Sequence, residues 1–424
     1  MNVQKPKVKP FAISKKLIFE AYEKVKANKG AAGVDKQSIA AFEENLKDNL
    51  YLLWNRMSSG CYFPPPVKAV EVPKKGQGTR TLGIPTVADR IGQTAVAMLL
   101  EKEVEPLFHP DSYGYRPQRS ALDAVGMCRQ RCWKNDWIVD LDIKAFFDSV
   151  PHDQLLDMVS RHTDQRWVML YIERWLKAPM QRASGTITAR DRGTPQGSAV
   201  SPVLANIFMH YAFDTWMAER FPTVPFERYA DDGVAHCKSE QQANHVKSEI
   251  AKRLAAFGLE LHPDKTKIVY CKDSNRKVDH ETIVFDFCNY TFRPRMAKNR
   301  NGQYFTAFLP AIGDEAAKAK KADMRAWKIG RSSDKSLSEL AAMINIVVQG
   351  WINYYGKFYP SILVQMLKRI NTMLVKWARR KYKRLRTSRR RAEKWLANVA
   401  RREPNLFAHW RFGARPNGWA TRAG

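Results

Sequence analysis

The chain has 424 residues, 44% of them hydrophobic, so it can bury a sizeable core and exceeds the usual size of a single domain. Its 71 Lys and Arg against 42 Asp and Glu give a formal net charge of +29, a surplus that repels itself unless an anionic partner is present. Six scattered cysteines argue against a disulfide framework, and no apolar run reaches the length of a membrane span. We therefore expect no membrane partner, a reducing compartment, and nucleic acid as the leading candidate ligand.

The first third of the chain alternates predicted helices with short extended segments. Apolar residues at helical spacing over 15–27, after a capping Ser14, predict an amphipathic helix. Residues 61–85 mix β-prone runs with proline and glycine, which predicts a hairpin with a basic tip. Helices and strands then alternate to about residue 295.

The segment "WIVDLDIKAFFDSVPHDQLL", residues 137–156, places acids on a predicted strand. Apolar residues alternate with Asp140 and Asp142, so both carboxylates lie on the face opposite the apolar side chains. Such acids are costly unless they are paired or bound to metal, and the strand offers no basic partner. A half-exposed strand with a solvated polar face remains the alternative for this segment alone.

A second acidic segment, "FERYADDGVAHC", residues 226–237, predicts a strand, a tight turn and a strand, with Asp231 and Asp232 at the bend. Two like charges about 4 Å apart repel by about 4 kcal/mol at an effective dielectric near 20. A divalent cation would offset that repulsion, and sites rich in carboxylate oxygens favour Mg²⁺. If both acidic segments meet in one sheet, they supply the ligands of a two-metal site for phosphoryl transfer.

These motifs occur in an order that resembles a known family. "DLDIKAFFD", "RGTPQGSAVSPVLANIFM" and "YADD" resemble the motifs of a reverse transcriptase. "SYGYRPQRSALDAV", "GLELHPDKTKIVY", "CNYTFRPR" and "NIVVQGWINYYGKFY" narrow the resemblance to a bacterial group II intron-encoded reverse transcriptase and maturase. The ordered match covers nearly the whole chain.

The resemblance implies an α+β fold: a right-hand polymerase with fingers and an antiparallel palm sheet, a helical thumb, and a basic helical C-terminal tail. We expect fingers and palm over 1–295, the thumb or maturase domain over 296–378, and a nucleic-acid-binding segment over 379–424. In the thumb, one apolar stripe is predicted at Ile344, Val347, Val348, Trp351, Ile352 and Tyr355.

The resemblance also assigns roles to residues in the polymerase part. It makes Asp142, Asp231 and Asp232 the catalytic ligands of two Mg²⁺ ions, helped by the backbone carbonyl of Ile143, and it makes Lys265 the proton donor to the leaving pyrophosphate. The residues expected at the incoming nucleotide are Lys74 and Arg80 at the triphosphate, Gln196, and Phe147 as a gate against the ribose 2′-hydroxyl. Without the resemblance, Phe147 would be taken for an ordinary core residue.

Further residues are predicted to contact nucleic acid. Tyr290 lies in the primer-gripping turn, where "CNY" replaces the Leu-Gly of many relatives; Asn tolerates the left-handed backbone that Gly often supplies. From residue 361 to the end there are 18 Lys and Arg against two Glu, with Trp377, Tyr382 and Trp395 among them, which favours phosphate contacts and base stacking. The predicted contacts in the tail are Arg379, Arg380, Lys381, Lys383, Arg384, Arg389, Arg390 and Arg391.

The resemblance therefore implies a Mg²⁺-dependent RNA-directed DNA polymerase that also assists splicing and mobility of a group II intron. Its expected partners are intron RNA, template RNA with a DNA primer, dNTP and target DNA, in a bacterial cytoplasm and at the nucleoid when DNA is bound. No Cys/His cluster follows residue 402, so we expect no appended endonuclease module. A splicing-only maturase and a related reverse transcriptase used in defence or repair are the alternatives; the oligomeric state stays open.

Overall fold

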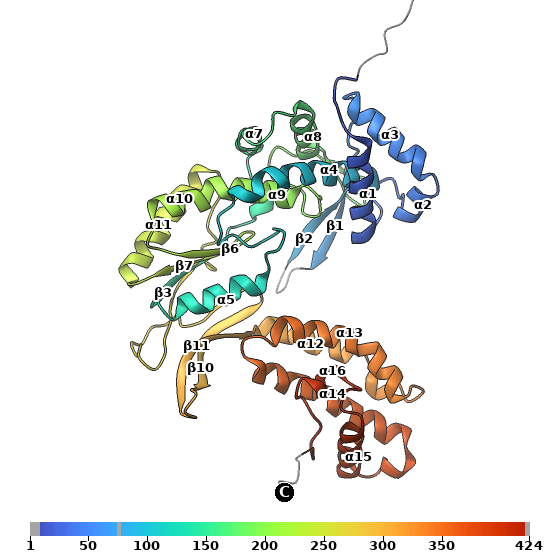
Figure 1. Ribbon diagram of the computed structural model, residues 1–424, viewed down its shortest axis with the longest axis vertical. Helices are drawn as coiled ribbons and strands as arrows, with labels where there is room; N and C mark the ends of the chain where they lie inside the picture. Colours follow the sequence, from blue (N-terminus) through green and yellow to red (C-terminus); the bar gives the residue numbers. More distant parts are fainter. Residues whose placement is uncertain (1–8, 74–77, 420–424) are drawn as a thin grey trace, which may run out of the picture. The chain divides into compact units, whose positions relative to one another are not determined.

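The computed structural model describes residues 9–73 and 78–419, which form two compact units. The first unit comprises the described parts of Met1–Ala124 and Val139–Ile268, and the second comprises those of Val125–Ile138 and Val269–Gly424. Figure 1 shows the elements of both units. Within these residues, no helix combines the length and apolar character needed to cross a membrane.

The chain up to Ile268 contributes most of the helices. These are α1 (Lys15–Asn28), α2 (Ile39–Glu43), α3 (Leu46–Ser58), α4 (Val87–Val104), η1 (Glu105–Leu107), α5 (Ala121–Cys132), α6 (Phe146–Ser149), α7 (His152–Ser160), α8 (Arg166–Lys177), α9 (Ser201–Met209), the π-helical turn η2 (His210–Asp214), α10 (Thr215–Arg220) and α11 (Glu240–Ala256). The strands are β1 (Val67–Pro73), β2 (Thr79–Ile84), β3 (Trp137–Leu141), β4 (Met180–Gln181), β5 (Ile187–Thr188), β6 (Phe226–Tyr229), β7 (Asp232–Cys237) and β8 (Lys267–Tyr270).

The rest of the chain begins with strands and continues with helices. The strands are β9 (Phe285–Phe287), β10 (Tyr290–Lys298) and β11 (Tyr304–Ile312). The helices are α12 (Asp314–Ala326), η3 (Ile329–Arg331), α13 (Leu337–Tyr355), α14 (Pro360–Lys381), η4 (Lys383–Leu385), α15 (Arg389–Arg402) and α16 (Ala408–Arg411).

A four-stranded sheet with the order β6-β7-β3-β8 carries the acidic segments. β6 and β7 form the predicted antiparallel hairpin, with Tyr229 opposite Asp232 at its turn. Val234, Ala235 and Cys237 of β7 are fully buried, and α11 packs on this strand. The sheet core is thus built from the apolar residues of the two segments in which the acids were singled out, and β3 and β7 are neighbours in it.

The predicted fingers hairpin is also present. β1 and β2 pair antiparallel from Lys68 opposite Ile84 to Pro73 opposite Thr79, and the tip, 74–77, lies outside the described residues. The predicted N-terminal helix is α1, whose Ser14 hydroxyl accepts the Lys16 N–H. α1 packs against α4, and its buried residues are Ile18, Ala21, Tyr22 and Val25.

In the second unit, an antiparallel sheet of order β11-β10-β9 leads into the helices. Ser336 and Glu339 form a capping box at the start of α13, a local signal that fixes where this helix begins. α14 packs against α15, and α13 against α16. The C-terminal segment is therefore helical, as predicted, and it is folded onto α13 and α14.

The predicted domain bounds do not coincide with element ends. The position between 295 and 296 falls inside β10, and that between 378 and 379 falls inside α14. Because both elements are hydrogen-bonded through these positions, neither bound separates independently folded pieces. The assignment of functional domains to these ranges stays a prediction, whereas the α+β class with an antiparallel palm sheet is confirmed.

Candidate active site

Asp142 is the first residue after β3, an inner strand of the palm sheet. Its backbone carbonyl accepts the His262 N–H at 2.8 Å, and the Thr266 hydroxyl lies 3.3 Å from the same oxygen. Lys265 places its Nζ 3.1 Å from Asp142 Oδ2. The "HPDKT" segment thus fixes the Asp142 backbone by hydrogen bonds and places the predicted cation, Lys265, beside its carboxylate.

A two-residue turn, Ala230 and Asp231, joins β6 to β7, and Asp232 is the first residue of β7. The turn contains no glycine, and Ala230 adopts a positive φ of 59°, a conformation that costs a non-glycine residue about 1–2 kcal/mol. Asp231 is half-buried, and the side chain of Asp232 still reaches solvent. The predicted bend therefore exists, and strain is concentrated in it.

The electrostatics show that the three predicted acids converge. Burial raises the pKa of Asp231, and the nearby Asp142 carboxylate raises it further. The pKa of Asp232 rises to about 7, first through burial and then through repulsion from Asp231 and Asp142, with Lys265 opposing the rise. Although Asp232 touches solvent, protein atoms crowd it on most sides, which explains how an accessible carboxylate can be poorly solvated. Two separate segments thus bring three carboxylates into one site.

This donor set fits a divalent cation. Carboxylate oxygens are the ligands that Mg²⁺ prefers, and an ion that neutralises mutual repulsion gains most where the carboxylates are crowded. The Ile143 carbonyl is adjacent in sequence to the Asp142 ligand, and Ile143 itself is buried and bridged to Leu261. One salt bridge from Lys265 does not balance three acids. Asp142, Asp231 and Asp232 are therefore the residues that would hold metal.

The predicted nucleotide-binding residues lie on segments that touch one another. Gly83 of β2 donates its N–H to the Gln196 carbonyl at 2.7 Å, and Thr194 donates to the Phe147 carbonyl at 2.6 Å. Phe147 is half-buried in α6, with its ring centroid 5.2 Å from that of Phe146. Lys74 lies outside the described residues. A chain of backbone bonds therefore links the fingers strand, the "TPQG" loop and the start of α6.

The contact between the fingers strand and the "TPQG" loop requires glycine. Gly197 has φ +113°, and a Cβ there would lie 2.5 Å from the Gly83 carbonyl oxygen. A Cβ on Gly83 would in turn lie 2.8 Å from Val67. Both positions therefore exclude larger residues, which sets the spacing between the hairpin that carries Arg80 and the loop that carries Gln196.

Sequence reasoning assigned no role to Tyr115, although the motif that contains it was noticed. Its side chain is about half exposed, its φ is +58°, and its pKa is raised by burial and then by Asp231, Tyr229 and Asp232. Arg80 opposes that rise, so the Arg80 guanidinium lies on the same side as the acids. The sequence showed that "SYGYRP" contains this tyrosine, but no pattern in it predicted that Tyr115 would lie beside the acidic turn.

Comparison with known proteins decides the family. Residues 72–305 match the model described as "Reverse transcriptase (RNA-dependent DNA polymerase)", which is more than half of the chain. The chain belongs to the reverse transcriptase family. Residues 317–395 match the "Group II intron, maturase-specific domain", so the predicted combination of reverse transcriptase and maturase is confirmed.

Individual relatives agree with this assignment. Protein YkfC of Escherichia coli K12 is 30% identical over 61% of this chain and 77% of its own length. The group II intron-encoded protein LtrA of Lactococcus lactis subsp. cremoris is 32% identical over 46% of this chain, which spans 32% of LtrA. An uncharacterized 91 kDa protein in the cob intron of Schizosaccharomyces pombe is 32% identical over 82% of this chain, half of its own length. A telomerase chain from Candida albicans, solved with telomeric RNA, gives a TM-score of 0.47 at 13% identity over 88% of this chain and 68% of its own, too low to add to the argument.

In this reverse transcriptase, Tyr290 occupies a buried position in the second unit. It is completely buried, its hydroxyl donates to the Tyr354 carbonyl, and its ring packs on those of Tyr355 and Phe358. The predicted direct contact of Tyr290 with nucleic acid therefore needs correction. The prediction for the preceding turn holds, since Asn289 adopts a left-handed backbone with φ +62°.

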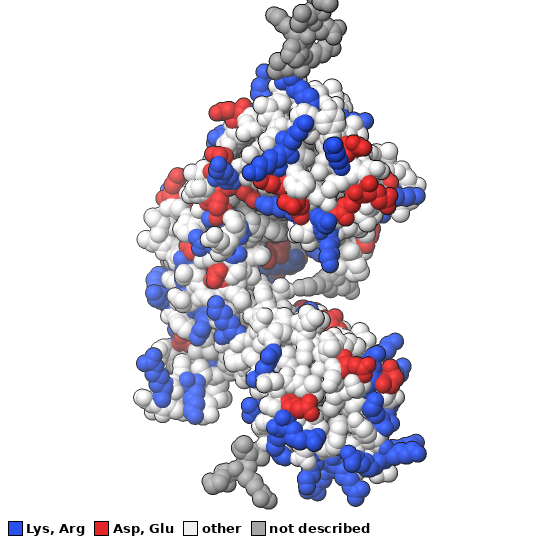
Figure 2. Space-filling view, turned by 45° about the vertical axis from the view of Figure 1, so that its right-hand side comes forward, with Lys and Arg blue, Asp and Glu red and all other residues white. Residues whose placement is uncertain are grey.

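Cations gather over the C-terminal helices of the reverse transcriptase, as Figure 2 shows. Some of the predicted contacts serve the fold: Arg380 donates to the Gly330 carbonyl and Lys381 to those of Ser333 and Lys335. Others are exposed and form no ion pair or side-chain hydrogen bond among residues 9–73 and 78–419, namely Lys383, Arg384, Arg390 and Arg391. Arg379 donates to the Arg386 carbonyl, and Arg389 pairs with Glu393.

A groove of about 180 Å³ between α14, α15 and the C-terminal segment collects three more cations. Lys368, Arg369 and Arg415 line it, all exposed and none paired with an acid among the described residues. The predicted contacts covered 379–391, between Arg369 and Arg415 in sequence, so the sequence prediction missed these residues. Arg415 is fixed by a cation–π contact, 4.6 Å from the Trp419 ring, so part of this groove is preorganised.

The aromatic residues among the cations are mostly structural. Trp377 is fully buried and donates its ring N–H to the Ser332 carbonyl at 2.9 Å. Tyr382 and Trp395 pack on each other with ring centroids 5.2 Å apart. The prediction that Trp377 stacks on bases is therefore wrong, because its ring helps to join α14 to η4 and α15.

The predicted stripe on α13 is narrower than expected. Ile344, Val348, Trp351 and Tyr355 are buried, whereas Val347 is 42% exposed. The predicted stripe took in apolar residues at both three- and four-residue spacing, and it therefore included Val347, which lies outside the face that packs on neighbouring helices. The core of this helix is otherwise as predicted.

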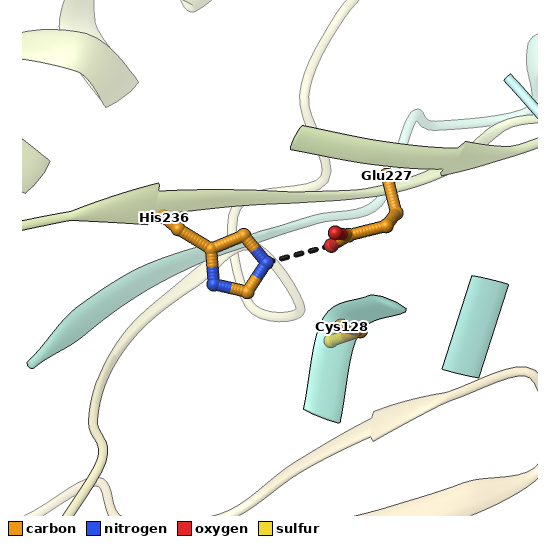
Figure 3. A group of neighbouring side chains, drawn as sticks. All are labelled: Cys128, Glu227 and His236. Carbon is orange, nitrogen blue, oxygen red and sulfur yellow. Dashed lines mark hydrogen bonds and ion pairs between the residues drawn. The ribbon is translucent and has the colours of Figure 1, made fainter. Parts of the chain in front are cut away.

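Behind the acidic turn, a buried pair ties β6 to β7. His236 and Glu227, both fully buried, approach to 2.6 Å between Nε2 and Oε2 (Figure 3). A charge-assisted bond of this kind between adjacent strands restrains the hairpin whose turn carries Asp231 and Asp232.

Removing the charge of Asp232 should stabilise the metal-free protein. With its pKa raised from 3.8 to about 7, the carboxyl binds a proton more tightly in the folded state, so its contribution to stability declines as pH rises between these values. In EDTA at pH 8, Asp232→Asn should therefore melt a few degrees higher than wild type, and the difference should vanish below pH 4. Thermal denaturation at several pH values measures this, with Asp164→Asn, an exposed acid elsewhere, as control. A variant that melts lower at pH 8 would contradict the assigned repulsion.

Proposed function

We propose that this protein is a Mg²⁺-dependent RNA-directed DNA polymerase that extends a DNA primer on an RNA template and binds group II intron RNA to assist splicing and mobility. The observation that carries the proposal is the convergence of Asp142, Asp231 and Asp232, whose repulsion is visible in the raised pKa of Asp232. The family match supports it over the same residues.

The chemistry follows from what these residues hold. Two bound Mg²⁺ ions would lower the pKa of the primer 3′-hydroxyl and offset charge on the leaving pyrophosphate. Asp142 and the turn at 231–232 keep the ligands at fixed positions, because their backbones are hydrogen-bonded into the palm sheet and the "HPDKT" segment. Preorganised ligands of this kind need no rearrangement during the reaction.

Lys265 is proposed to donate a proton to the pyrophosphate. In the metal-free protein its ammonium group lies on Asp142, 3.1 Å away, and the side chain is 60% exposed. If Asp142 holds a metal ion instead, this long and partly solvated side chain would be free to turn toward a phosphate.

Residues around α6 are proposed to select the nucleotide substrate. Phe147 would exclude a 2′-hydroxyl and so favour dNTP, Arg80 would bind the triphosphate, and Gln196 would lie beside the nucleotide. The backbone bonds from Gly83 to Gln196 and from Thr194 to Phe147 support a shared site. Exposed Arg80 on β2 offers the bidentate geometry that phosphate prefers.

Intron RNA, template RNA with its primer, and target DNA are the proposed partners. The maturase-specific match over 317–395 and the exposed cations of the C-terminal helices support this. A polymerase with these partners would work in the bacterial cytoplasm and at the nucleoid. A splicing-only maturase does not require three converging carboxylates, so the palm favours polymerisation.

Replacing Asp231 by Ala should abolish DNA synthesis without abolishing RNA binding. Losing one metal ligand removes several kcal/mol of transition-state stabilisation, a decrease of about a hundredfold or more in rate. Primer extension on an RNA template with Mg²⁺ measures synthesis, and filter binding measures affinity for intron RNA. Asp164→Ala, an exposed acid with no partner among the described residues, is the control. Equal extension by Asp231→Ala and wild type would refute the assigned chemistry.

Shortening Phe147 to Ala should relax discrimination against ribonucleotides. Removing the ring opens space for the 2′-hydroxyl, so the ratio of kcat/KM for dNTP over that for rNTP should fall about tenfold or more. Single-nucleotide incorporation kinetics measure this ratio. Phe63→Ala, an exposed phenylalanine beside α8, controls for loss of an aromatic side chain. An unchanged ratio with normal dNTP kinetics would remove Phe147 from the gate.

Neutralising Lys368, Arg369 and Arg415 together with Gln should weaken RNA binding and lower its salt dependence. Each lost phosphate contact reduces the slope of log K against log salt by about 0.7 to 0.9, so three should reduce it by roughly two. Titrations between 50 and 300 mM salt, roughly the range over which such slopes are resolved, test this. The matched triple, Lys16, Arg161 and Lys252, consists of cations paired with acids in the first unit. Identical slopes for both triples would exclude the groove.

A further inference from the structure

The turn that carries Asp231 has an unusual backbone, which is held in place by buried neighbours. Ala230, the first of the two turn residues, has a positive φ where glycine is usual. Such a backbone persists only where its surroundings hold it. Two neighbours do so: Arg228 from the preceding strand, and Gly114 from the "SYGYRP" segment.

The Arg228 guanidinium is 1% exposed and every one of its five N–H donors has a partner. Nη1 donates to the Ala230 carbonyl at 2.9 Å and to Asn206 Oδ1 at 3.1 Å. Nε and Nη2 donate to the two oxygens of Asp214 at 2.7 and 2.6 Å, and Nη2 also donates to the Ser112 hydroxyl at 2.8 Å. A rigid planar group held by Asp214, Asn206 and Ser112 thus fixes the Ala230 carbonyl in the turn.

The partners of Arg228 come from elements that are themselves fixed. Asn206 also donates to the Gly114 carbonyl at 2.8 Å. A Cβ on Gly114 would lie 2.3 Å from the Ala230 nitrogen, so this segment presses directly on the turn. Ala230 is therefore clamped from two sides, and the same asparagine ties both clamps together.

Asp214 is the last residue of η2, a π-helical turn between α9 and α10. A π-turn inserts one residue into the helical phase and is frequently found at functional sites. Here it ends on a fully buried carboxylate that forms a two-point ion pair with Arg228. The irregular helix therefore has an assignable purpose: it brings Asp214 to Arg228.

We propose that Arg228 is a positioning residue of the polymerase reaction, which fixes the strained Ala230 backbone and thereby the direction in which Asp231 and Asp232 present their carboxylates. Because its side chain is only 1% exposed, it would touch neither substrate nor metal. The inference rests on the proposed polymerase function. It adds that catalysis requires not only the three acids but also a buried group that fixes the backbone from which two of them project.

Arg228→Lys keeps the positive charge beside Asp214 but cannot reproduce five bonds in one plane. We expect kcat for primer extension to fall about tenfold to a hundredfold, with KM for dNTP changed less than threefold, since mispositioned ligands affect the transition state more than nucleotide binding. The Mg²⁺ concentration for half-maximal activity should rise several-fold. If this variant fails to fold, Ser112→Ala, which removes a single bond to the guanidinium, should shift kcat and the Mg²⁺ requirement in the same direction.

Ala230→Gly separates positioning from general stability. Glycine adopts a positive φ without strain, so the turn should depend less on its clamp. The double variant of Arg228→Lys and Ala230→Gly should therefore recover part of the lost kcat and of the Mg²⁺ affinity. In a double-mutant cycle, its loss should be smaller than the sum of the two single losses. Strictly additive losses, or losses of activity that follow the melting temperature alone, would overturn the proposal.

Direct binding of Mn²⁺, followed by its electron paramagnetic resonance signal, tests the positioning without any polymerisation. Arg228→Lys should weaken Mn²⁺ binding several-fold, and Ala230→Gly should restore part of it. If wild type binds Mn²⁺ but extends no primer, the proposed function fails while the positioning role still stands or falls on this measurement. Unchanged Mn²⁺ affinity and an unchanged kcat in Arg228→Lys would refute it.

Discussion

Mutual repulsion among three carboxylates is the constraint on which the rest of the palm depends. Asp142 follows β3, Asp231 lies in the turn between β6 and β7, Asp232 begins β7, and the fold brings them together although this raises the pKa of Asp232 to about 7. A chain tolerates such crowding only if the surrounding backbone resists relaxation. The Glu227–His236 pair and the Arg228 network supply that resistance in the hairpin, and the Lys265 ion pair partly offsets the charge of Asp142.

How far the sequence predicted this site depends on the distance over which each signal acts. Alternation of apolar and acidic residues located Asp142, and the two-residue turn located Asp231 and Asp232, because strand periodicity and turn geometry are local. The pairing that unites the segments came from the family resemblance. Arg228 carried no local signal, since a lone Arg on a strand is indistinguishable from an exposed cation until Asp214 and Asn206 arrive from a distant helix.

Charge density was the weaker guide. The count of cations beyond residue 360 correctly marked a basic surface, but it could not tell which cations serve the fold. Arg380 and Lys381 donate to backbone carbonyls, whereas Lys368 and Arg369, about three to four turns earlier on the same helix, have no such partner among the described residues. Trp377 and Tyr290 show the same limit for aromatics, because burial is decided by packing partners that lie far along the chain.

The two kinds of electrostatic site in this protein call for opposite kinds of support. Surface cations that bind a phosphate backbone tolerate flexible side chains, since attraction between point charges needs no fixed direction. Metal ligands that must present oxygens to two ions tolerate very little movement. This difference in tolerance for movement accounts for where the buried polar residues lie. Arg228, Asp214 and Asn206 are buried behind the acidic turn, while the cations of the C-terminal groove remain exposed. The rigid part of the design thus lies where direction decides the chemistry.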